Sequence, residues 1–203
     1  MDMVCMPSSQ ISRIIAVYFI GFALGGLLFP LPDKYGRRFS LIFGLTTNLA
    51  CQYGIVFSSN YWVRTACFGG IGLFQIKNSV SYVWLFECVY SKQKPLACTC
   101  INSFDALPML VTCIYFAFIS KHWFPLELVA LLVGTAALII VVFAMPESPR
   151  WLLLNGKTKE AIKNLNYIAW FNSSTQRIPE NAQFVEDLNA QDIVVENLER
   201  SRI

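Results

Sequence analysis

Five long apolar runs constrain the fold of this chain more than any other feature. A helix needs about 20 mostly apolar residues to cross the hydrocarbon core of a bilayer. The first two runs contain no charged residue. The runs cover residues 14–31, 39–57, 61–88, 96–119 and 124–145. They predict an all-α polytopic membrane protein with about five membrane-spanning helices over 14–145.

Charged residues are distributed unevenly along the 203 residues. Residues 11–145 contain 13 charged residues in 135, whereas 146–203 contain 15 in 58. An average soluble chain is about one quarter charged, so only the second part has an ordinary composition. This pattern excludes a disordered chain, a small disulfide scaffold and a nucleic-acid-binding protein.

The cysteines and the histidine do not suggest a metal site. There are seven cysteines and one histidine, His122. The cysteines well inside the apolar runs are Cys51, Cys67, Cys98, Cys100 and Cys113. Cys98 and Cys100 are separated by one residue, which is not the CxxC spacing of a zinc or redox motif. We therefore expect no metal, no cofactor and no catalytic site.

Basic residues in the connections predict the orientation, because lysine and arginine accumulate on the cytoplasmic side. One side holds nine of them: Lys34, Arg37, Arg38, Lys92, Lys94, Arg150, Lys157, Lys159 and Lys163. The other side holds Arg13, Arg64 and Lys121. We expect an extracytoplasmic segment over 1–13 and a cytosolic helical tail over 146–203, with the plasma membrane as the location.

The tail has an amphipathic helical pattern. Small and apolar residues recur at helical spacing at Ala161, Ile162, Leu165 and Ile168, with lysines between them. Such a helix can lie on the membrane surface or against the ends of the spans.

Two short motifs flank the middle spans. The connection after the first run reads Asp33-Lys34-Tyr35-Gly36-Arg37-Arg38, and Gly36 supplies the positive φ that so tight a reversal needs. Pro146-Glu147-Ser148-Pro149-Arg150-Trp151-Leu152 follows the fifth run, where two prolines stop the helix. Each motif alone is compatible with an ordinary connection.

Together, about 110 residues apart, the two motifs resemble those of the major facilitator superfamily. The first resembles the loop between its second and third helices. The second resembles the sequence after the sixth helix of organic ion transporters and sugar porters. Arg64, Gly70 and Gly72 are similar to the pattern of the fourth helix, and Glu87 with Lys94 to its end.

This resemblance implies that the five runs are helices two to six of that fold. It also implies a cytoplasmic gate of ion pairs. The residues that match the gate and its motifs are Asp33, Gly36, Arg37, Arg38, Arg64, Glu87, Lys94, Glu147 and Arg150. Phe29 and Phe68 replace expected glycines, and a first helix and second half have no counterpart, so we expect a truncated or incomplete chain.

Two ionisable residues lie deep in the apolar runs. Lys77 and Asp105 are at similar predicted depths on consecutive antiparallel spans, so the two can pair. Charged groups in a membrane are costly and usually face a cavity or each other. Both residues are candidates for a substrate cavity, and the alternative is a structural ion pair.

The expected function is secondary transport of small organic ions, with the lipid bilayer and the substrate as partners and no nucleic acid. Residues 96–119 contain no glutamine, which favours organic ion transporters over the alternative, a sugar-porter-like carrier. A second alternative is a non-transporting membrane fragment that regulates a full-length transporter. On either interpretation, a second chain could supply the missing helices.

Overall fold

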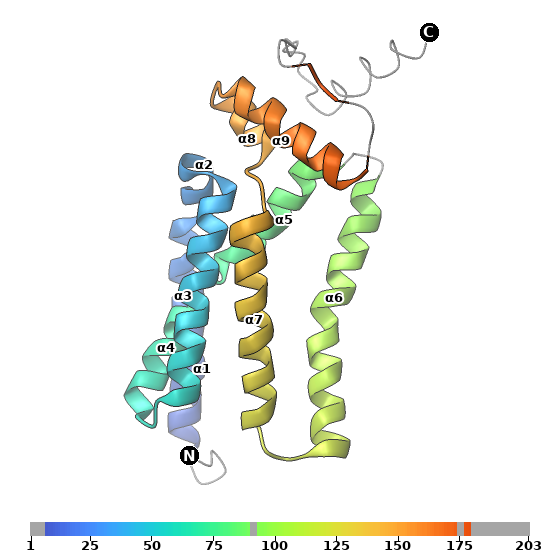
Figure 1. Ribbon diagram of the computed structural model, residues 1–203. Helices are drawn as coiled ribbons and strands as arrows, with labels where there is room; N and C mark the ends of the chain where they lie inside the picture. Colours follow the sequence, from blue (N-terminus) through green and yellow to red (C-terminus); the bar gives the residue numbers. More distant parts are fainter. Residues whose placement is uncertain (1–6, 90–92, 174–176, 180–203) are drawn as a thin grey trace.

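The computed structural model describes residues 7–89, 93–173 and 177–179, and within them the chain forms helices and no strands. The helices are α1 Ser8–Gly25, η2 Gly26–Leu28, α2 Leu31–Tyr35, α3 Arg37–Phe57, α4 Tyr61–Leu73, α5 Ile76–Cys88, α6 Lys94–Ile114, η4 Tyr115–Ile119, α7 Phe124–Ala144, α8 Pro149–Leu154 and α9 Thr158–Phe171. This confirms the predicted all-α fold. The long helices stand side by side, and α8 and α9 lie across one end (Figure 1).

Four helical segments among the described residues are long and apolar enough to cross a membrane. They are Ser8–Leu28, Arg37–Phe57, Lys94–Ile119 and Phe124–Ala144. At 1.5 Å per residue, 21 residues rise about 32 Å, which matches the hydrocarbon core of a bilayer. The first segment starts earlier than expected, because residues 8–13 belong to α1. Residues 1–6 lie outside the described chain.

The third apolar run, 61–88, differs from its prediction as one continuous span. It is divided between α4 and α5, each of 13 residues. At the break, Gln75 N donates to Gly72 O and Lys77 N donates to Phe74 O, both three residues back. The two helices share one neighbour and differ in another: both pack against α3, but α4 also packs against α1, whereas α5 reaches α8.

Glycines hold α1 and α4 in direct backbone contact. A Cβ on Gly21 would overlap the carbonyl oxygen of Gly69, and one on Gly25 would lie 2.5 Å from that of Leu73. From the other helix, a Cβ on Gly72 would overlap the carbonyl oxygen of Tyr18. Small residues spaced in this way let membrane helices approach closely.

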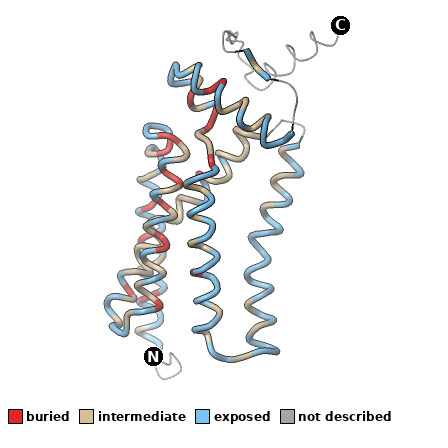
Figure 2. Tube along the Cα trace, in the orientation of Figure 1, coloured by how far each residue is buried: buried red, intermediate tan, exposed pale blue. Residues whose placement is uncertain are grey.

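Helix α3 is the centre of the bundle, because it contacts α4, α5 and α7. Two apolar clusters form along it: Leu41, Val80 and Met145 near one end, and Leu49, Val56 and Leu131 farther along. In contrast, α6 buries none of its residues. Figure 2 shows the buried residues concentrated on the α3 side of the bundle and near α8.

The predicted helical tail is represented by α8 and α9. Ser148 precedes α8 and its side chain accepts a hydrogen bond from Trp151 N, while Pro149 occupies the first turn. Both are favoured at a helix start. Residues 180–203 of the predicted tail lie outside the described chain.

Candidate functional site

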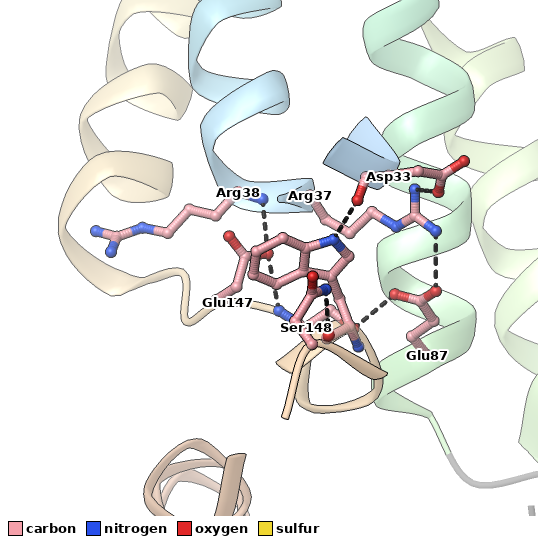
Figure 3. A network of polar contacts seen from close by, with 8 residues as sticks. Asp33, Arg37, Arg38, Glu87, Glu147 and Ser148 are labelled. Carbon is pink, nitrogen blue, oxygen red and sulfur yellow. Dashed lines mark hydrogen bonds and ion pairs between the residues drawn. The ribbon is translucent and has the colours of Figure 1, made fainter. Parts of the chain in front are cut away.

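A cluster of charged and polar side chains joins four segments at the end of the bundle where α8 and α9 lie (Figure 3). We call it the polar cluster. Its members are Asp33, Arg37, Arg38, Glu87, Glu147, Ser148 and Trp151. They come from α2, the start of α3, the end of α5, and the α7–α8 connection with α8.

Gly36 makes the turn that places this cluster. Its φ is +103°, which L side chains rarely adopt, and this confirms the predicted positive φ. A Cβ at this position would also lie 2.5 Å from Glu147 Oε2. The glycine therefore permits the reversal from α2 to α3 and leaves room for the Glu147 carboxylate.

Arg37 is the central cation of the polar cluster. Its guanidinium pairs with Asp33 one turn earlier and donates from Nη2 to Glu87 Oε1 at 3.3 Å. The Arg37 and Glu87 side chains are 16% and 11% exposed, whereas that of Asp33 is 69% exposed. The pair with Glu87 is therefore sheltered from water, and the pair with Asp33 is largely open to it.

The Glu147 carboxylate accepts hydrogen bonds from backbone N–H groups. Its Oε1 accepts from Arg38 N at 2.9 Å and from Ser148 N at 3.0 Å. Arg38 N is in the first turn of α3, where a negative charge is favourable because of the helix dipole. The Arg38 guanidinium donates to Val142 O, at 2.7 Å, near the end of α7.

Ser148 and Trp151 complete the cluster, and sequence reasoning assigned neither of them to the gate. Ser148 is fully buried, and its Oγ donates to Glu87 Oε2 at 2.6 Å. The Trp151 Nε1 donates to Asp33 O at 2.7 Å. The Ser-Pro pair ahead of α8 is a helix-start signal that could have pointed to Ser148.

Three residues of the predicted gate and its motifs lie outside the polar cluster. Arg64 is at the other end of the bundle, where it donates to Ser58 O at 2.6 Å and lies over the Trp123 ring. Arg150 is exposed and forms no ion pair with a described residue. Lys94, at the start of α6, forms no ion pair with Glu87.

The two cavity candidates are not paired with each other. Lys77 is partly buried and donates from Nζ to Gln75 Oε1 at 3.3 Å. Asp105 is exposed on α6 and accepts a hydrogen bond from the Tyr82 hydroxyl. The predicted depths alone allowed a pair, but the partners are set by which way each helix face points.

Four membrane-length helical segments among the described residues, with a cluster of charged side chains at one end, define this chain as an integral, multi-pass membrane protein. The model of the family described as Sugar (and other) transporter matches residues 3–201, and the chain belongs to this family. This confirms the resemblance to the major facilitator superfamily.

Curated relatives cover most of the chain. It is 30% identical over 196 residues to the beta-alanine transporter of Drosophila melanogaster, covering 95% of this chain and 31% of the relative. It is 28% identical over 208 residues to organic cation/carnitine transporter 2 of Rattus norvegicus, covering 99% of this chain and 37% of that relative. The chain thus spans about a third of the length of these relatives.

Proposed function

We propose that this chain is part of a secondary transporter that moves small organic ions by alternating access, and that the polar cluster holds its cytoplasmic side closed. The observation that carries the proposal is the chain of contacts from Arg37 through Glu87 to Ser148. These contacts join the start of α3, the end of α5 and the connection before α8, which are far apart in the sequence. The named substrates of the relatives, which include organic cations and carnitine, support the substrate class.

The contacts of the polar cluster are weak enough to be broken and re-formed during alternating access. Ion pairs in contact with water contribute about 0–1 kcal/mol each, and the Asp33–Arg37 pair belongs to this class. The sheltered contacts of Glu87 contribute more, since a hydrogen bond to a charged group is worth about 1.5–3 kcal/mol. A rearrangement driven by substrate binding can offset a total of a few kcal/mol.

Lys77 and Asp105 remain the candidates for a substrate-facing role in this proposal. Each has one uncharged hydrogen-bonding partner, Gln75 and Tyr82 respectively, and neither forms an ion pair within the described chain. A charged group in such a position is available to an ionic substrate. A full-length relative with a neutral residue at either corresponding position should show reduced uptake or altered charge preference, and unchanged values for both would contradict the role.

The transport proposal is tested by reconstituting the chain into lipid vesicles. Uptake and thermal stabilisation are measured with a panel of organic cations, organic anions and sugars, and empty vesicles are the control. A response to organic ions supports the proposal, and a response to sugars alone supports the sugar-porter alternative. No response to any compound counts against transport by this chain alone.

A second candidate function is that of an accessory chain that binds or regulates another transporter chain. It is favoured by α6, which buries none of its residues and exposes large apolar side chains such as Phe104 and Met109. Co-expression with a full-length relative distinguishes the two. Co-purification with altered uptake by the relative, together with no uptake by this chain alone, supports the accessory function.

A further inference from the structure

Helix α9 is fixed to the end of the bundle along one face. Ala161 and Ile162 are buried there. Asn164 Nδ2 donates to Glu147 O at 3.0 Å, and the Tyr167 hydroxyl donates to Ala144 O at 3.2 Å. The helix lies across the bundle and slopes toward the start of α6 (Figure 1). On its opposite face, Asn166 donates to Ile178 O at 2.9 Å and accepts from Ile178 N at 2.8 Å, so residues 177–179 contact this face at that point.

That opposite face carries two kinds of side chain. Lys159 and Lys163, one turn apart, are exposed and form no ion pair with a described residue. In the last turns, Trp170 and Phe171 are 64% and 72% exposed. Glu160 is the one acidic residue of α9, so the first half of the exposed face has a net positive charge.

The contact with Ala144 sets the depth of α9 relative to the membrane. Ala144 ends α7, which is one of the membrane-length segments, so the Tyr167 hydroxyl lies at the boundary of the apolar region. Trp170 is one turn farther along the helix, and tryptophan and tyrosine are enriched at membrane–water interfaces. Lys163 lies about 10 Å back along the helix from Trp170, within reach of lipid headgroups.

We propose that the exposed face of α9 binds acidic phospholipids, with Lys159 and Lys163 contacting the headgroups and Trp170 and Phe171 entering the interface. Charge complementarity favours this occupant, because Lys159 and Lys163, which form no ion pair with a described residue, outnumber the single glutamate of α9, and acidic lipids carry net negative charge. The Tyr167 hydroxyl contacts the end of α7, and Trp170 follows one turn later, so this position favours a lipid surface over a soluble partner. This binding goes beyond transport and needs only the placement of the chain in a membrane.

The test measures which lipids lie beside Trp170 in the full chain. The chain is reconstituted into phosphatidylcholine nanodiscs that contain a fixed minor fraction of either brominated phosphatidylserine or brominated phosphatidylcholine, since bromine quenches nearby tryptophan. Subtracting the signal of Trp170→Phe isolates Trp170 from the other four tryptophans. We expect stronger quenching by the serine lipid, because each lysine near a surface favours acidic lipid about fivefold.

Matched variants assign the preference to the two lysines. Lys159→Gln/Lys163→Gln should remove the excess quenching by phosphatidylserine, and Lys159→Arg/Lys163→Arg should keep it. Lys121→Gln, at the opposite end of the bundle, should leave it unchanged. Thermal unfolding in pure phosphatidylcholine confirms that each variant is folded.

Three results would overturn the proposal. The first is equal quenching by the two brominated lipids, and the second is an excess that survives in the Lys→Gln double variant. Quenching by neither lipid would show that Trp170 is away from the bilayer and would also overturn it. Both leaflets of a nanodisc have the same composition, so the result does not depend on which side is cytosolic. It is also independent of whether the chain transports a solute.

Discussion

At the scale of the residue, Gly36 is constrained twice, by its backbone conformation and by the Glu147 carboxylate beside it. Gly36→Ala should lower the free energy of unfolding by about 2 kcal/mol or more, because a strained φ costs about 1–3 kcal/mol and the new Cβ would also displace Glu147. The measurement is thermal or denaturant unfolding of the chain in detergent micelles.

Gly156→Ala is the matched control for this substitution. Gly156 also has a positive φ, +71°, but a Cβ there would meet nothing within 4 Å. Gly156→Ala should lower the free energy of unfolding by about 1 kcal/mol, which is the cost of the backbone strain alone. If the two substitutions cost the same, the contact between position 36 and Glu147 has no energetic importance.

Glu87 and Asp33 both pair with Arg37, yet substituting them should lower the free energy of unfolding by different amounts. Glu87→Ala leaves the buried Ser148 hydroxyl without its acceptor and removes the sheltered partner of Arg37, so we expect a loss of about 1–3 kcal/mol. Asp33→Ala should cost less than about 1 kcal/mol, because the Asp33 side chain is mostly exposed. Unfolding of the two variants in the same micelles makes the comparison, and an equal or larger effect at Asp33 would contradict it.

Much of the polar cluster could be predicted from the sequence, because its residues belong to two short motifs with few alternatives. Gly36, Arg37 and Glu147 are examples. The exact partners could not be predicted. Glu147 binds backbone N–H groups, and Ser148 rather than Arg150 contacts Glu87. These choices depend on how the α7–α8 connection is folded, which residue types alone do not determine.

At the scale of the element, the contact between α1 and α4 depends on glycines. Gly21→Ala should destabilise the chain by about 1–3 kcal/mol, because the new Cβ would overlap the carbonyl oxygen of Gly69 and force the two helices apart. Gly26→Ala is the control, since a Cβ there would meet nothing within 4 Å. Unfolding in micelles measures both, and a cost at Gly26 equal to that at Gly21 would mean that close packing is not the cause.

The helices themselves were predictable where length and hydropathy suffice. The runs that contain α1, α3, α6 and α7 are long enough to span a bilayer on their own. The break at Phe74 and Gln75 was not predicted, although Gln75, Lys77 and Asn78 interrupt the apolar run at this point. Both α4 and α5 pack against α3, but α4 also packs against α1, and the spaced glycines Gly21 and Gly25 are the sequence signal for that contact.

At the scale of the whole molecule, the two ends of the bundle differ in charge. The end with α2, α8 and α9 carries Arg37, Arg38, Lys159 and Lys163 among its basic residues, whereas Lys121 lies in the α6–α7 connection at the other end. This asymmetry agrees with the nine-to-three distribution of lysine and arginine in the sequence. It predicts that the end with α9 faces the cytosol.

This orientation can be measured with cysteine substitutions at exposed positions. Lys121→Cys should react with a membrane-impermeant maleimide on intact cells, because the α6–α7 connection is expected outside, whereas Lys157→Cys should react only after the cells are permeabilised. The unsubstituted chain is the control, since it corrects for labelling of the native cysteines. Reaction of Lys157→Cys on intact cells, with Lys121→Cys protected, would establish the opposite orientation. The polar cluster would then lie on the outer side of the bundle, so the same experiment decides on which side the proposed closure would act.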